Sequence, residues 1–223
     1  MKIDIIIVSN AKDACFEAMT QQAIYTCHES EEDIKFNCVV YEQNTDVIYD
    51  KAFTIHYDFP FHYNKIMNDG ITATHHPYVC MCNNDLIFHK GWATRILEEM
   101  GSKVLSASPN HFRCEDEPKV ISGYDIGNGG QIKGWCIFTN RKLYSMIGKI
   151  DESVSFWYSD HVYADQLKRQ NIEHILVRDS YVEHLGSKTI HSEDNVVKNI
   201  LCGDQEKIYN EISNNNFGQY HKL

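Results

Sequence analysis

Amide and carboxylate side chains follow an apolar stretch near the middle of the 223-residue chain. The run Val79-Cys80-Met81-Cys82 is typical of a buried strand, and Asn83, Asn84 and Asp85 come directly after it. Open α/β sheets bind their ligands at the carboxyl ends of the strands. A carboxylate with amide neighbours at such an end suits a divalent cation that in turn holds phosphates. The competing interpretation is an ordinary turn, where aspartate and asparagine are common.

Three more polar positions fall at strand ends or helix starts that the same topology would bring together. Glu42 follows the second strand-like run, Asp160 opens a helical pattern, and His184 closes a late strand. Two carboxylates and an imidazole around one cleft can ligate a metal and leave a further carboxylate free as a base. The plainer alternatives are that Asp160 caps its helix and that His184 is an ordinary partnered histidine.

Strand and helix patterns alternate along the first half of the chain. The first strand is expected over residues 3–8, and the helices and strands that follow it are expected over about 15–28, 36–41, 61–73, 78–83, 91–100 and 103–107. This order predicts an α/β fold with a mainly parallel sheet and helices on both faces. Later strands are expected over 133–139, 174–177 and 180–183, and later helices over 141–147 and 160–170.

Two segments lack such a pattern. Residues 114–131 are charged and then glycine-rich, which predicts a long loop of the kind that contributes to binding sites. Residues 191–223 are polar and rich in asparagine, with one weakly amphipathic stretch near 196–200, and are expected to form a C-terminal tail.

Composition limits the classes of function. The net charge of −10 disfavours broad affinity for nucleic acid, because phosphate contacts dominate such binding. No run approaches the roughly 18 apolar residues of a membrane span, and the eight cysteines lie mostly in apolar runs, as buried free thiols do in a reducing compartment. A cytoplasmic protein is therefore expected, with Cys80 and Cys82 on one face of a strand.

Over residues 1–190 the chain resembles the family-2 glycosyltransferases of GT-A fold. The matching segments follow the family's order: 5–10 and 39–44 for its first two strands, 61–71 before the donor strand, 83–85 in place of its D-x-D motif, 148–160 for its catalytic region, and 182–187 for its closing histidine segment. Two positions depart from the pattern, because Asn83 replaces the first acid of D-x-D and Ser159 replaces a glutamate beside Asp160.

The resemblance implies a role for each matching position. Residues 1–110 would form the nucleotide-sugar half and 111–190 the acceptor and catalytic half, with Asp160 as the base of an inverting transfer. Asp85 and His184 would bind Mn2+ or Mg2+, with the imidazole favouring manganese. Donor-binding positions would be Ser9, Asn10, Glu42, Asn64, Asn68, Asn83 and Asn84. Trp135 and Trp157 flank the motifs and are either core residues or stacking platforms for the acceptor.

The donor expected from this resemblance is a nucleotide-sugar, foremost a UDP-sugar carrying a hexose or pentose, and the acceptor is unknown. The small size also resembles short bacteriophage transferases that glycosylate hydroxymethylated DNA bases. Such an enzyme would act in the host cytoplasm on a flipped base, with Lys119, Lys133, Arg141 and Lys142 as a basic rim. A nucleotidyltransferase and a non-catalytic nucleotide-sugar-binding module are the rival interpretations, although the first would want a glycine-rich phosphate loop after strand one.

Overall fold

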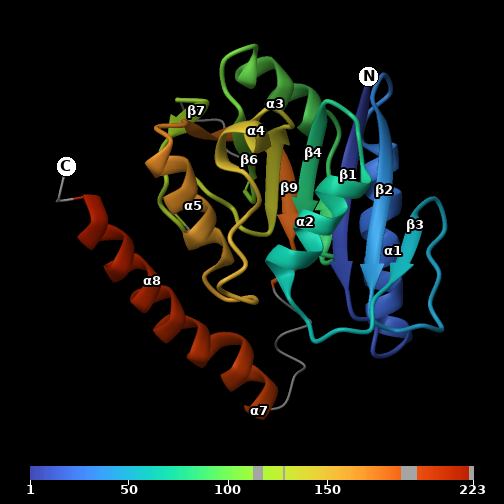
Figure 1. The fold of residues 1–223 in the computed structure, drawn as a ribbon. Coiled ribbons are helices and arrows are strands. Elements are labelled where there is room, and N and C mark those ends of the chain that lie inside the picture. The colour runs from blue at the N-terminus through green and yellow to red at the C-terminus, as the bar shows by residue number, and fades with distance from the viewer. Residues whose placement is uncertain (113–117, 128, 187–194, 221–223) are drawn as a thin grey trace.

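The computed structural model describes residues 1–112, 118–127, 129–186 and 195–220. In these residues nine strands form one mixed sheet in the order β3-β2-β1-β4-β8-β6-β9-β5, with β7 paired to β9 (Figure 1). The strands are β1 (Lys2–Ser9), β2 (Lys35–Glu42), β3 (Phe53–His56), β4 (Tyr78–Cys82), β5 (Leu86–Phe88), β6 (Ser106–Asn110), β7 (Val120–Ser122), β8 (Cys136–Asn140) and β9 (His174–His184). The helices are α1 (Ala14–Glu29), α2 (Tyr63–Ala73), α3 (Trp92–Met100), α4 (Leu143–Ile147), α5 (Ser159–Arg169), α7 (Asn195–Lys198), the π-helical turn η1 (Asn199–Gly203) and α8 (Asp204–Tyr220).

Helices cover both faces of the sheet, as the alternating pattern predicted. On β1 the side chains of Ile3, Ile5 and Ile7 face α1 and α3, whereas Ile6 and Val8 face α2, α4 and α5. Strand side chains alternate between faces, so a strand covered on both sides must be apolar at nearly every position. That requirement explains the apolar run from Ile5 to Val8.

The sheet changes direction beyond β4. Strands β1 to β4 pair in parallel, but β8 lies antiparallel between β4 and β6, with Cys82 opposite Cys136. The sequence pattern did not indicate this reversal. The antiparallel pairing places the start of β8 beside the end of β4. Gly134 and Trp135, just before β8, therefore lie near Asn83 and Asp85, just after β4.

Several elements differ from the sequence-based expectation. Strands β3 and β5 were not expected, β6 begins at Ser106 and not at 103, and β9 is one long strand in place of two. Within the expected loop 114–131, residues Val120–Ser122 form β7, while residues 114–117 and 128 lie outside the described residues. The expected tail is helical over residues 195–220, and the domain boundary expected at 190 falls outside the described residues.

The C-terminal helices pack against the segment that leads into α5. The backbone N–H of Trp157 donates to the carbonyl of Leu201 at 3.2 Å, and the Ser155 N–H donates to Oε1 of Gln205 at 2.6 Å. The Tyr209 ring stacks on that of Tyr158 with centroids 5.0 Å apart. These contacts hold η1 and α8 beside the segment that leads into α5.

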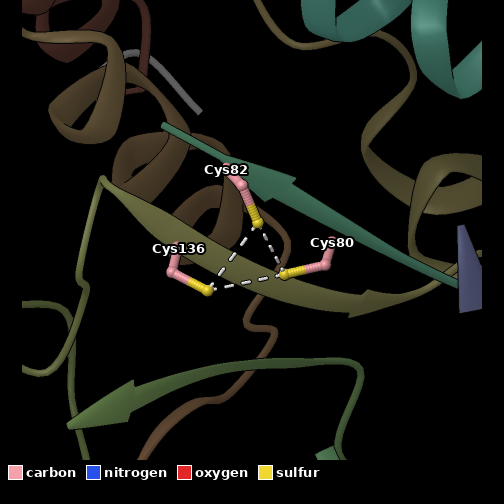
Figure 2. A group of neighbouring side chains, drawn as sticks. All are labelled: Cys80, Cys82 and Cys136. Carbon is pink, nitrogen blue, oxygen red and sulfur yellow. Dashed lines mark hydrogen bonds between the residues drawn. The ribbon is translucent and has the colours of Figure 1, made fainter. Parts of the chain in front are cut away.

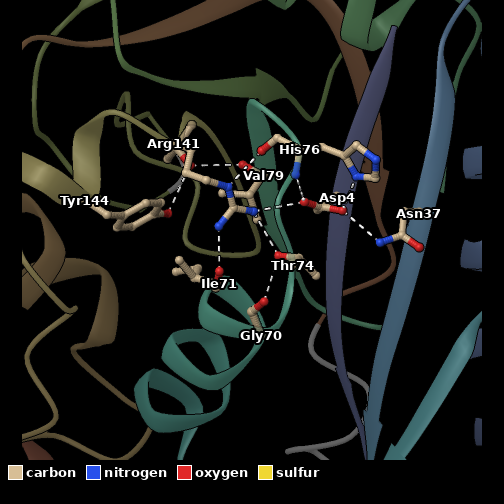
Figure 3. Close-up of polar contacts among 10 residues, drawn as sticks. Asp4, Asn37, Gly70, Ile71, Thr74, His76, Val79, Arg141 and Tyr144 are labelled. Carbon is tan, nitrogen blue, oxygen red and sulfur yellow. Dashed lines mark hydrogen bonds and ion pairs between the residues drawn. The ribbon is translucent and has the colours of Figure 1, made fainter.

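A buried ion pair ties the amino-terminal ends of the central strands together (Figure 3). Asp4 of β1 is fully buried, and its Oδ2 accepts hydrogen bonds from Nη2 of Arg141 at 2.9 Å and from the His76 N–H at 2.8 Å. Its Oδ1 accepts from Nδ2 of Asn37 at 2.8 Å and lies 2.6 Å from Nδ1 of His76. Arg141 also donates to the carbonyl of His76 and to Oγ1 of Thr74. Buried charges are stable only when they are paired and hydrogen-bonded in this way.

Candidate active site at the carboxyl ends of the strands

Asp85 and His184 meet at the edge of the sheet. Asp85 lies in the short connection between β4 and β5, and β5 pairs antiparallel with β9 so that Leu86 is opposite His184. This register brings Nε2 of His184 to 3.2 Å from Oδ1 of Asp85, with side chains 15% and 2% exposed. The Leu185 N–H donates to the Asp85 carbonyl at 2.9 Å and fixes the two segments to each other. The structure thus brings these two residues together, and their role as metal ligands stays a prediction.

Two aromatic rings hold His184 in place. The ring of Trp135 stacks on that of His184, with centroids 5.2 Å apart and planes at 16°. The His184 backbone N–H donates to Nδ1 of His111 at 2.9 Å. Burial, followed by the charge of His184, lowers the pKa of His111, which favours its neutral form. No sequence motif marks His111, which follows β6 directly.

The donor set of this pair fits a divalent cation. Nε2 of His184 is buried and makes no hydrogen bond within the described residues, and it faces a carboxylate oxygen. Mg2+ and Mn2+ take few protein ligands and complete their shells with water and phosphate oxygens, so one carboxylate and one imidazole are a sufficient protein contribution. Asn83 in place of the first acid of a D-x-D motif leaves Asp85 as the carboxylate of the triplet.

Asn84 and Ser9 belong to one buried polar cluster. Nδ2 of Asn84 donates to Oγ1 of Thr20 at 3.0 Å and to Oγ of Ser9 at 3.4 Å, and Ser9 also bonds the hydroxyl of Tyr49 at 3.1 Å. The cluster anchors the Asn83-Asn84-Asp85 turn to the end of β1.

The carboxylate of Glu42 is buried and bonds to other protein groups. Its Oε1 accepts hydrogen bonds from the backbone N–H of Ala11 at 2.9 Å and of Asn44 at 2.8 Å, and its Oε2 accepts from the Tyr49 hydroxyl at 2.7 Å. The carboxylate therefore fastens the loop after β1 to the end of β2. Glu42 could therefore affect donor binding only indirectly, by fixing the position of Asn10 in that loop.

Asn64 and Asn68 fix a neighbouring segment. Nδ2 of Asn64 donates to the carbonyl of Asp151 at 2.7 Å. The Asn68 side chain donates to the Ile150 carbonyl and accepts from the Ile150 N–H, at 2.8 and 2.9 Å. Neither residue lines the cavities described next. Both asparagines are thus placed to position the chain ahead of α5, and direct donor contact stays a prediction.

Two cavities meet at this edge of the sheet and share Asn83 and Phe156. The first has a volume of about 550 Å3 and the second about 700 Å3, which is the size range of small-molecule sites. The first is lined by Ser9, Asn10, Gln43, Asn84, Asp85 and apolar residues of α7 and η1. The second is lined by His111, Trp135, Trp157, Asp160, His161 and His184. Asp85 and His184 therefore stand at the junction of the two cavities.

Asp160 faces the second cavity from the first turn of α5. The N-cap of this helix is Tyr158, whose φ of 68° is left-handed, so the interpretation of Asp160 as the N-cap is wrong. Oδ1 of Asp160 accepts from the N–H of His161 at 2.9 Å and lies 2.9 Å from its Nδ1. Gly134 passes so close that a Cβ there would lie 2.8 Å from Oδ2 of Asp160. A side chain at position 134 would displace this carboxylate, so its position requires glycine there.

The two tryptophans differ in exposure. Trp135 is half-buried against His184, whereas the Trp157 side chain is 47% exposed at the mouth of the second cavity. Trp157 is therefore not a core residue. Its ring is available for stacking on a sugar or base, and Trp135 combines a ring contact with lining the cavity.

The expected basic rim does not form as predicted. Arg141 lies in the Asp4 ion pair at the amino-terminal ends of the strands, so it does not line the cavities (Figure 3). Lys133 lines the second cavity, but it is buried, which lowers its pKa, and its Nζ donates to the Gly127 carbonyl at 3.3 Å. Lys119 and Lys142 are absent from the lining of both cavities.

Comparison with protein-family models and with curated protein sequences gives no match. Comparison with solved structures finds a crystal structure of GalNAc-T7 with UDP, GalNAc and Mn2+, at a TM-score of 0.63 and 7% sequence identity. The chain has a GT-A-like α/β fold. The match covers 82% of this chain and 43% of that chain, so this chain spans less than half the length of GalNAc-T7.

The similarity is to a nucleotide-sugar glycosyltransferase and is distant. It shows the fold alone, and membership of a glycosyltransferase family stays a prediction. The fold class expected from the sequence is confirmed. Among the described residues, the helices are too short or too polar to cross a membrane.

Proposed function

We propose that the protein is a metal-dependent, inverting glycosyltransferase that moves a sugar from a nucleotide-sugar to an acceptor hydroxyl. The observation that carries the proposal is the meeting of Asp85 and His184, 3.2 Å apart, at the junction of two cavities. A transferase of this kind needs a cation between a donor compartment and an acceptor compartment. A single-substrate binding module would need only the first compartment.

The first cavity would hold the donor nucleotide. Its polar lining comes from the ends of β1 and β4, where ligands of α/β sheets bind, and Asn10 and Asn83 supply amide groups there. Phe61 and Phe156 form an apolar wall, with rings 5.5 Å apart. We take a UDP-sugar as the first donor to test, since UDP is the nucleotide in the GalNAc-T7 structure.

Asp85 and His184 would hold Mn2+ or Mg2+ against the donor diphosphate. When bound, the cation neutralises the charge that develops on the departing nucleoside diphosphate. The cluster of Asn84, Ser9 and Thr20 would keep the Asp85 turn in place. Trp135 and His111 would orient the imidazole, since outer partners of a ligating histidine set its tautomer and direction.

The second cavity would receive the acceptor. Asp160 would accept the proton of the attacking hydroxyl while the new glycosidic bond forms on the face opposite the leaving diphosphate. Trp157 and Trp135 would flank the acceptor. Arg141 lies away from both cavities, and Lys133 is the only member of the expected basic rim that lines the second cavity, so DNA enters the test as one acceptor among several.

The proposal is tested by turnover with a panel of nucleotide-sugars. The protein is incubated with each donor, with Mn2+ or with chelator, and with an acceptor panel of saccharides, peptides, lipids and hydroxymethylated DNA. Mass spectrometry should detect one transferred sugar, only when the cation is present. Asp33→Asn, at an exposed carboxylate at the opposite end of the sheet, should act like the parent. Nucleotide binding without turnover on any acceptor would favour the non-catalytic module, and transfer unaffected by chelator would contradict the metal role.

A further inference from the structure

The sulfurs of three cysteines from β4 and β8 lie close together on one face of the sheet (Figure 2). Cys80 and Cys82 lie on the same face of β4, and Cys136 on β8 is directly opposite Cys82. The Sγ–Sγ distances are 3.4 Å between Cys80 and Cys82, 3.5 Å between Cys80 and Cys136, and 3.9 Å between Cys82 and Cys136. The three sulfurs therefore form a nearly regular triangle.

The triangle lies in the apolar core beneath α1 and α3. All three side chains are fully buried, and their sulfurs hydrogen-bond to one another. Burial raises the pKa of the Cys80 and Cys82 thiols. For Cys136 burial acts the same way, but hydrogen bonds from Cys80 and Cys82 outweigh it and lower its pKa. Buried cysteines often serve only as small apolar residues, and packing alone does not require three sulfurs to meet.

We propose that Cys80, Cys82 and Cys136 form a binding site for Cu(I), a soft, thiophilic metal ion. Thiolates prefer such ions over the hard Mg2+ and Mn2+, so this site is distinct from Asp85 and His184. With metal–sulfur bonds of about 2.3 Å, three sulfurs in a plane around one ion lie about 4.0 Å apart. The three observed Sγ–Sγ distances would each increase, by about 0.1 to 0.6 Å.

Loading the site is an exchange of protons for the ion. Each thiol that becomes a ligand releases its proton to solvent as its sulfur bonds to Cu(I), and no electron is transferred. With all three thiols deprotonated, the complex carries a net charge of −2, which the metal–sulfur bonds must offset in the apolar core. The bound ion would link the ends of β4 and β8, and these strands continue into Asn83 and start after Trp135 at the candidate active site. Independently of the proposed activity, the ion would therefore stabilise the fold.

The experiment is an anaerobic Cu(I) titration of the full chain against a colorimetric Cu(I) chelator. Cu(I) is added to the folded protein and, separately, during refolding, so that burial does not block entry. We expect one chelator-resistant ion per chain and a raised melting temperature. Cys15→Ala, at an exposed cysteine, and Cys27→Ala, at a buried cysteine outside the triangle, should keep the ion. Cys80→Ala, Cys82→Ala and Cys136→Ala should each lose it.

A second measurement needs only the parent protein, in case a core variant does not fold. X-ray absorption at the copper edge should show sulfur neighbours alone in three-coordination. Nitrogen or oxygen neighbours, absence of a retained ion after both loading routes, or retention in all three triangle variants would overturn the proposal.

Discussion

Asp160→Asn should bind the donor and cation almost as well as the parent and lose transfer by about 100-fold or more, the usual contribution of a general base. The substitution keeps the shape of the side chain and removes its ability to accept a proton. Asp160 lies in the second cavity, apart from the first cavity that we assign to the donor. Turnover and donor affinity, measured on the same protein, separate chemistry from binding.

Gly134→Ala provides a second route to the same result. A Cβ at this position would lie 2.8 Å from Oδ2 of Asp160, so the carboxylate must move while its charge is kept. We expect reduced turnover with donor affinity preserved. Gly129→Ala, where a Cβ meets nothing within 4 Å, is the matched control and should behave like the parent.

Turnover of Asp160→Asn within a few-fold of the parent would place the base elsewhere, with Asp151 and Glu152 next to test.

Asp4→Asn should lower the free energy of unfolding by about 3 kcal/mol, because it leaves Arg141 without its buried counter-charge. Urea denaturation measures this directly. Asp69→Asn removes an exposed partner of Lys65 in a pair of the same 2.9 Å length, and it should cost less than about 1 kcal/mol. Similar losses in both variants would show that the buried network adds nothing beyond a surface pair.

The same network predicts a dependence on pH. Burial opposes ionisation of Asp4, but hydrogen bonds from Asn37 and His76 outweigh it, so its pKa is lowered in the folded protein. The folded state therefore binds the proton less readily than the unfolded state. The stabilisation is complete above the unfolded pKa of about 3.9 and is lost as the pH falls through the folded pKa. Asp4→Asn should flatten this part of the acid denaturation profile, and an unchanged profile would contradict it.

Local patterns were sufficient for the longer elements of the first half of the fold, which are β1, α1, β2, α2, β4 and α3. The run from Ile5 to Val8 is apolar because helices cover both faces of β1, and that requirement is visible in the sequence alone. Strands β3 and β5 escaped prediction because they are four and three residues long and exist through their pairing with β2 and β9. Helix α8 has many asparagines, which are weak helix formers, and its place depends on tertiary contacts such as that of Tyr209 with Asp165.

The site could be predicted only in part. Asp85 and His184 were found because each ends a recognisable strand. His111 was missed because only the pairing of β9 brings the His184 backbone to it. Arg141 was assigned to a rim by its charge, and its partner Asp4 lies 137 residues away in the sequence. Long-range pairing of this kind leaves no local signal.

The central claim is that Asp85 and His184 hold a cation that binds the donor. Calorimetry of UDP binding to the parent, with Mn2+ and then with chelator, tests it most directly. We predict that chelator removes binding, that Asp85→Asn weakens binding in Mn2+ by roughly 10- to 100-fold, and that His184→Ala has a smaller effect, as one neutral ligand among several. Asp33→Asn should match the parent. Equal UDP affinity with Mn2+ and with chelator would contradict the account.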